Sequence, residues 1–175
     1  MTKPVRTLLT RTDLVETPTD TSLRLYETDD GFFTLRKGRD LLMSDHDMES
    51  TGACLMLVLD LFKVWNPKWS LAMIGMGLTV IPRLLKFAPL ADRTIYELEQ
   101  CIIDWNTKEA PWKGELVQWN IVKGDYRKTL AGPHDVLIHD AGDVPSDTFL
   151  REHVRPGGYV CVYKNDALYH LRKLD

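Results

Sequence analysis

Five short apolar segments, each followed by a stretch of helical character, constrain the fold of this 175-residue chain more than any other feature. They cover residues 71–75, 94–98, 116–122, 135–141 and 159–163. Strands that alternate with helices require right-handed crossovers, which place the strands parallel in one sheet. The largely apolar runs LAMIG, DVLIHDA and YVCVY are typical of central strands covered by helices on both faces. We therefore predict an α/β chain with a mostly parallel, doubly wound, Rossmann-like sheet of about five core strands.

The segment before this sheet predicts a small separate module. Residues 1–21 are rich in Thr, Pro and charge and predict a loosely attached arm. Two strand-like stretches then flank Asp29-Asp30-Gly31, and Asp-Gly is typical of a tight β-hairpin turn. A helix is expected over 47–65, with Ser44 as its N-cap and Asp47 as the partner in a capping box. The predicted domains are an arm and hairpin module over 1–46 and a Rossmann-like domain over 47–175.

Composition and charge exclude several classes of protein. The formal charge of −3 argues against nucleic-acid binding, because the phosphate backbone rewards concentrated positive charge. The longest uninterrupted apolar run, 53–59, is far shorter than the roughly 20 residues that a membrane helix needs, and the N-terminus carries no apolar stretch of signal-peptide length. The three cysteines show no paired metal-ligand spacing. These features predict a cytoplasmic protein with reduced thiols that binds no metal, membrane or nucleic acid.

Two glycines, Gly75 and Gly77, follow the first predicted core strand. In a parallel sheet, ligands bind at the carboxyl ends of the strands, so the glycines predict a small molecule against the backbone there. The third position of a dinucleotide fingerprint would be Val80, which counts against NAD or FAD. Glu97 ends the next strand, where a carboxylate can accept hydrogen bonds from ribose hydroxyls, or can simply end the strand at the surface. The N–H groups near Leu78 are expected to be open to a carboxylate.

Four motifs make the chain similar to a known family. MIGMGLTVIPRLL resembles the first strand and glycine loop of the class I S-adenosylmethionine-dependent fold, and within it of the spermidine synthases, the polyamine aminopropyltransferases. IYELE is similar to their ribose-binding strand end, VKGDYRKTL to the segment that meets adenine, and HDVLIHDAGDVP to their aspartate segment. The resemblance covers roughly residues 70–163 and implies a methyltransferase-type sheet. It also implies a cofactor site that includes Gly75, Gly77, Glu97, Gly124 and Asp125.

The same resemblance implies roles for single residues. Glu97 would hold the ribose and Asp125 the adenine amino group. Asp140 would activate an attacking amine, and Asp143 would help to bind a polyamine. The alternative for this pair is that Asp140 ends a strand and Asp143 orders the following turn. His139 is expected to point to the opposite face of the sheet and to pack there.

The chain also departs from the family pattern. The acidic residue of the family's glycine loop is absent from Met76-Gly77-Leu78-Thr79, and Val144 separates Asp143 from Pro145. After Tyr163 the chain leaves room for one short helix, and not for the antiparallel strand pair that completes the family's sheet. The sheet therefore looks truncated, with an exposed edge that predicts a homodimer.

Aminopropyl transfer is the leading function that this resemblance implies. The co-substrate would be S-adenosylmethionine or its decarboxylated form, the acceptor a small-molecule amine, and no metal would be needed. An S-adenosylmethionine-dependent methyltransferase is the second possibility, because the same fold and cofactor serve it. The third is a non-catalytic protein that binds an adenosyl ligand or has a regulatory role. The five tryptophans could form a partner surface but are more simply explained by packing.

Overall fold

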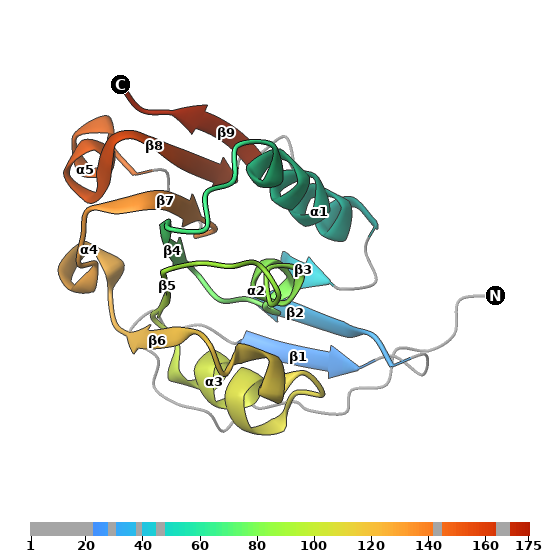
Figure 1. Ribbon diagram of the computed structural model, residues 1–175. Helices are drawn as coiled ribbons and strands as arrows, with labels where there is room; N and C mark the ends of the chain where they lie inside the picture. The colour runs from blue at the N-terminus through green and yellow to red at the C-terminus, as the bar shows by residue number, and fades with distance from the viewer. Residues whose placement is uncertain (1–22, 28–30, 38–39, 45–47, 142–144, 164–168) are drawn as a thin grey trace.

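The structure is a computed structural model that describes residues 23–27, 31–37, 40–44, 48–141, 145–163 and 169–175 (Figure 1). Its centre is a six-stranded sheet in the order β6-β5-β4-β7-β8-β9. Neighbouring strands from β6 to β8 are parallel, and β9 is antiparallel to β8. The strands are β4 (Ser70–Ile74), β5 (Asp92–Glu97), β6 (Asn120–Lys123), β7 (His134–His139), β8 (Val154–Tyr163) and β9 (Tyr169–Lys173). This mixed α/β architecture confirms the predicted Rossmann-like fold.

Helices cover both faces of the sheet, because its central strands are apolar on both sides. On β4, Leu71 and Met73 face one hydrophobic cluster, whereas Ala72 and Ile74 face a second. Helix α1 (Met48–Lys63) packs into the first cluster together with α2 (Val80–Leu84). Helices α4 (Tyr126–Thr129) and α5 (Asp147–His153) pack into the second, on the opposite side in Figure 1. Between β5 and β6 lie α3 (Gln100–Asp104), a π-helix (Trp105–Glu109) and a 3-10 helix (Lys113–Leu116).

The predicted hairpin is present and gains a third strand. Strands β1 (Leu23–Glu27) and β2 (Phe33–Lys37) pair antiparallel, and β3 (Asp40–Ser44) pairs with β2; Asp29 and Asp30 of the expected turn lie outside the described residues. Ser44 therefore ends a strand, and its hydroxyl lies 3.2 Å from that of Thr34, so its predicted role as helix cap is wrong. Side chains of this small sheet, Leu25, Phe33, Leu35 and Met43, belong to the same cluster as the buried face of α1.

Two further expectations about the core elements are corrected. The segment after β8 contains the strand β9, and not a short helix, because Tyr169–Lys173 pairs residue by residue with Tyr159–Tyr163. The third core strand begins at Asn120, later than predicted, because Leu116 ends the 3-10 helix before it.

Among the described residues, no helix is long and apolar enough to cross a membrane. Cys54, Cys101 and Cys161 are free thiols, as expected.

Candidate functional site

The carboxyl ends of four strands meet at one edge of the sheet. Three backbone hydrogen bonds of 2.9 Å tie them together, from Asp140 N to Ile74 O, from Gly75 N to Tyr96 O and from Gly124 N to Glu97 O. The residues predicted from separate motifs thus lie side by side. This edge is where ligands bind in open parallel sheets.

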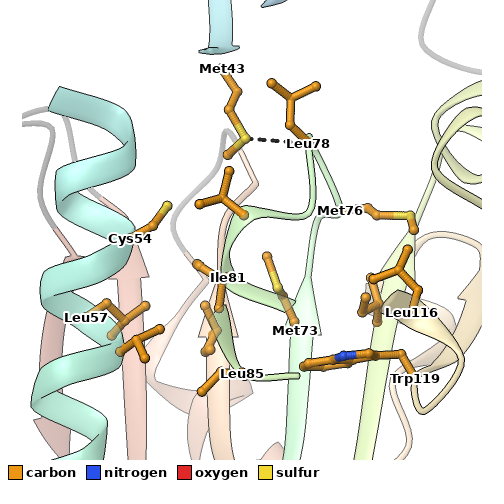
Figure 2. Packing of buried hydrophobic residues seen from close by; sticks show 14 of the residues in the cluster. Met43, Cys54, Leu57, Met73, Met76, Leu78, Ile81, Leu85, Leu116 and Trp119 are labelled. Carbon is orange, nitrogen blue, oxygen red and sulfur yellow. Dashed lines mark hydrogen bonds between the residues drawn. The ribbon is translucent and has the colours of Figure 1, made fainter. Parts of the chain in front are cut away.

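Both glycines of the loop after β4 have a positive φ and lie close to other parts of the protein. Gly75 has a φ of 87°, and a Cβ there would lie 2.4 Å from the Asp140 carbonyl oxygen. Gly77 has a φ of 47°, and its Cβ would lie 3.1 Å from the Met43 Sδ atom. The Leu78 N–H donates to the same sulfur at 3.3 Å (Figure 2). The prediction that this N–H is open is therefore wrong, and the close approach predicted for a ligand is made here by protein atoms.

Asn106 binds the backbone of the glycine loop through its side-chain amide. This residue was not identified from the sequence. Its side chain is fully buried, and its Nδ2 donates to Gly77 O at 2.9 Å. Its Oδ1 accepts from Thr79 Oγ1 at 3.3 Å and from Trp112 Nε1 at 3.0 Å. A polar residue inside the tryptophan-rich segment 105–112 was the available signal. The loop conformation depends on this amide, because a buried polar group that loses its partners is costly.

Glu97 ends β5, as predicted, and is 6% exposed. Its carboxylate accepts the Met76 N–H at 2.8 Å and the Glu99 N–H at 2.8 Å. Burial raises its pKa, backbone hydrogen bonds from Glu99, Met76 and Leu98 lower it, and the charge of Glu99 raises it, with a net upward shift. Each carboxylate oxygen has a second lone pair, so the predicted contact with a ribose remains open to test.

Asp125 is the N-cap of α4, and its Oδ1 accepts the Arg127 N–H at 3.1 Å. It follows Gly124, whose backbone is bonded to the end of β5, so both lie beside Glu97. The predicted contacts of Asp125 with adenine and of Gly124 with a cofactor stay predictions.

Asp140 directly follows β7, and its surroundings are the most unusual electrostatic feature of the site. The Tyr169 hydroxyl of β9 donates a hydrogen bond to its carboxylate, and the Cys54 thiol of α1 lies 3.9 Å from the Tyr169 oxygen. Burial raises the pKa of Asp140, the hydrogen bond from Tyr169 lowers it and the Glu97 charge raises it, with a net pKa of about 7. A carboxyl group with a pKa near neutrality can take up and release protons under physiological conditions.

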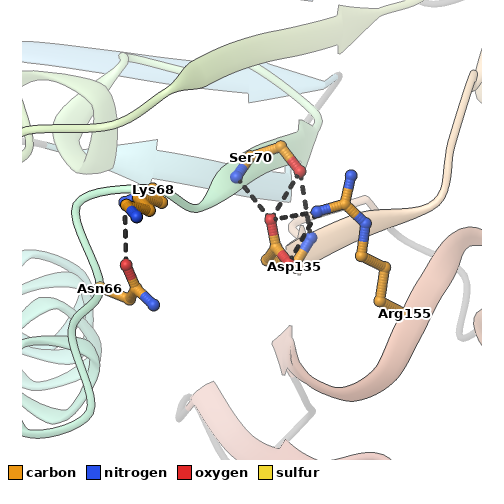
Figure 3. Close-up of polar contacts among 5 residues, drawn as sticks. All are labelled: Asn66, Lys68, Ser70, Asp135 and Arg155. Carbon is orange, nitrogen blue, oxygen red and sulfur yellow. Dashed lines mark hydrogen bonds and ion pairs between the residues drawn. The ribbon is translucent and has the colours of Figure 1, made fainter.

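Asp135 lies near the other end of the same strand and shows the contrast (Figure 3). It accepts hydrogen bonds from Ser70 N and from Arg155 Nη1, each at 2.8 Å. Burial raises its pKa, but the bonds from Ser70 and Arg155 outweigh burial, and the net shift is downward. Asp135 is therefore a structural carboxylate, whereas the surroundings of Asp140 suit proton transfer.

The remaining predicted residues are placed as follows. Asp143 lies outside the described residues. His139 is fully buried beneath Tyr126, with ring centroids 5.3 Å apart, which confirms its packing role. Within the described part of the chain, no group of three His, Cys, Asp or Glu side chains could hold a metal ion. Tyr169 was missed because it lies in the segment expected to be a short helix.

The sheet order, the glycine loop and the acidic strand ends define the class I fold of S-adenosylmethionine-dependent transferases. Comparison with solved structures agrees. The Thermotoga maritima spermidine synthase superposes with a TM-score of 0.63 at 16% identity over 80% of this chain and 51% of that one. A spermidine synthase in complex with the transition-state analogue AdoDATO superposes with a TM-score of 0.61 at 18% identity, over 80% of this chain and 51% of that one. MNMC2 from Aquifex aeolicus superposes with a TM-score of 0.54 at 18% identity, over 85% of this chain and 62% of that one.

The chain thus spans about half the length of the two spermidine synthases. No protein-family model and no curated protein matches the sequence. The identities are low enough that these likenesses show the fold alone.

Proposed function

We propose that this protein binds an adenosyl sulfonium compound at the edge formed by β4, β5, β6 and β7 and transfers its aminopropyl group to a small amine. The donor would be decarboxylated S-adenosylmethionine. The observation that carries the proposal is Asp140, whose carboxyl group has a pKa of about 7 and accepts a hydrogen bond from Tyr169, and whose backbone carbonyl lies against the Gly75 turn. The spermidine synthase fold over 80% of the chain supports the choice of reaction.

The charges at the site support a cationic donor and acceptor. The negative charge of Glu97 raises the pKa of Asp140, and the negative charge of Glu99 raises the pKa of Glu97. Asp125 lies at the end of the neighbouring strand. A sheet edge lined by carboxylates attracts sulfonium and ammonium groups and disfavours anions.

Asp140 would accept the proton that the amine must lose. The amine nitrogen attacks the carbon next to the sulfonium, the carbon–sulfur bond breaks, and a neutral thioether leaves. The protein contributes alignment and a base, which are the main requirements of such a displacement. We further propose that Asp143, three positions along the chain, binds the distal part of the amine.

Product analysis distinguishes this proposal from its alternatives. The protein is incubated with S-adenosylmethionine or its decarboxylated form and a panel of amines that includes putrescine and spermidine, and products are read by mass spectrometry. We expect an aminopropylated amine from the decarboxylated donor. A methylated product would replace the proposal with methyl transfer. Adenosyl-ligand binding in calorimetry without any product would leave a non-catalytic binding protein.

The variant Asp140→Asn is expected to lower turnover by roughly 100-fold or more, in the usual range for a positioned general base. Asn keeps the shape of the carboxyl group, so affinity for the adenosyl product should stay within about threefold. In the wild type, kcat/KM should rise with pH and level off above about 7, because the base must be ionised. Asp135→Asn is the matched control on the same strand. If kcat/KM shows no dependence on pH in the wild type or in Asp140→Asn, the role of Asp140 as a base is contradicted.

A further inference from the structure

Met43 reaches from the small N-terminal sheet onto the glycine loop. Its side chain is 9% exposed, and its Sδ and Cε atoms would lie 3.1 and 3.3 Å from a Cβ on Gly77. The same sulfur accepts the Leu78 N–H (Figure 2). A thioether of the protein therefore covers Gly77 and accepts the hydrogen bond of the Leu78 N–H, both at the carboxyl edge of the sheet where ligands bind in this type of fold.

Most backbone N–H groups of the loop donate hydrogen bonds to acceptors within the protein. The Met76 N–H is bonded to Glu97 and the Thr79 N–H to Met76 O, besides the bond from Leu78 to Met43. The third residue of α2 is Pro82, which has no N–H. The N–H groups of Met76, Leu78 and Thr79 are therefore not available to a carboxylate on this loop.

The charges near the loop also disfavour a bound carboxylate. The groups that act on Glu97 and Asp140 through charge are carboxylates. Arg83, the basic residue of α2, lies over the Trp112 ring with its Cζ 4.2 Å from the centroid. An α-carboxylate placed at Gly77 and Leu78 would lose its hydration and meet negative charge, whereas an ammonium group there would be attracted.

We propose that Met43 is a specificity-determining residue that restricts the site to adenosyl donors whose side chain lacks an α-carboxylate. Its sulfur accepts the hydrogen bond of the Leu78 N–H, and its side chain fills the space over Gly77. The inference rests on the proposed function, since it concerns the donor of that same site. It assigns the choice between carboxylated and decarboxylated donor to one side chain of the N-terminal sheet.

The test compares two stable thioethers that differ only in the carboxylate, S-adenosylhomocysteine and S-adenosyl-3-thiopropylamine. Calorimetry gives the dissociation constant of each with the full chain, with Met43→Ala and with Met43→Leu. Met43→Leu keeps the bulk over Gly77 but removes the acceptor for the Leu78 N–H. Leu42→Ala, on the same strand with a side chain 49% exposed, is the matched control. Circular dichroism checks that each variant is folded.

We expect the wild type and Leu42→Ala to bind the decarboxylated thioether at least about 10-fold more tightly. Met43→Ala should bring the two affinities within about threefold by strengthening the binding of S-adenosylhomocysteine, and Met43→Leu should give an intermediate ratio. Equal affinities in the wild type, or a ratio that neither Met43 variant changes, would overturn this inference and leave the proposed function standing. Binding of neither thioether to the wild type would overturn both.

Discussion

At the scale of single residues, two aspartates at opposite ends of β7 have different surroundings, Asp140 at the candidate site and Asp135 away from it. Asp140 has an upward-shifted pKa, chiefly because of burial, and Asp135 has a downward-shifted one because hydrogen bonds from Ser70 and Arg155 outweigh burial. Opposite shifts of this kind separate a proton-transfer group from a structural one. They also predict opposite effects on stability.

The ionised form of Asp140 is expected to cost stability. Its pKa rises from 3.8 in the unfolded chain to about 7 on folding, so the folded state binds the extra proton between these values. The contribution of Asp140 to the free energy of unfolding therefore falls as pH rises from about 4 to 7. Asp140→Asn, which cannot ionise, should gain up to about 4 kcal/mol relative to wild type at pH 8 and little at pH 4.

Urea unfolding of both proteins at pH 4, 6 and 8 measures this difference. Asp135→Asn is the control with the opposite sign, because a carboxylate with a lowered pKa stabilises the fold above its unfolded pKa. It should lose stability relative to wild type as pH rises. A difference between Asp140→Asn and wild type that does not grow with pH would show that Asp140 ionises freely in the folded protein.

At the scale of elements, the glycine loop is the joint between the sheet and the helices that follow it. It contacts the residue after β7 through Gly75, β3 through Gly77 and the π-helix through Asn106. A π-helix is uncommon and often lies near a functional site. The loop conformation is thus set by three elements distant in sequence, and a change in its backbone should affect all of them.

Gly75→Ala is expected to destabilise the protein by about 3 kcal/mol or more. The substitution adds a Cβ 2.4 Å from the Asp140 carbonyl oxygen at a φ of 87°. Left-handed backbone costs about 1–2 kcal/mol for a residue with a Cβ, and forced overpacking about 1–3 kcal/mol. Gly114→Ala is the control, because nothing lies within 4 Å of a Cβ there. Chemical denaturation that finds the two variants equally stable would contradict this account of the loop.

At the scale of the whole molecule, the small N-terminal sheet and the large sheet share one hydrophobic cluster. Phe33 of β2 lies 5.4 Å from the Trp105 ring and 5.3 Å from the Trp112 ring. Met43 of β3 contacts the glycine loop beside them. Trp105 and Trp112 therefore act in packing, and the small sheet contacts the glycine loop of the candidate site.

The homodimer stays a prediction at this scale. Among the described strands, β6 and β9 lie at the edges of the large sheet, and sheet edges favour association with another chain. Light scattering at high protein concentration should give about twice the mass of the 20.1 kDa chain. A mass that stays at one chain over the whole concentration range would rule the dimer out.

The sequence by itself determined the fold class and the edge of the sheet at which the candidate residues gather. Strand–helix alternation and apolar runs are local signals, and parallel strands bring their carboxyl ends together whatever the loops do. Gly75, Glu97, Gly124 and Asp140 could therefore be placed at one edge from their positions at the ends of the predicted strands.

Only the tertiary structure decided what these residues touch. The segment YHLRK has no long apolar run of its own and is a strand because it pairs with β8, which brings Tyr169 to Asp140. Met43 reaches Leu78, and Asn106 reaches Gly77, across 35 and 29 positions of sequence. Contacts at such separations depend on how whole elements pack, and no local pattern of residues specifies them.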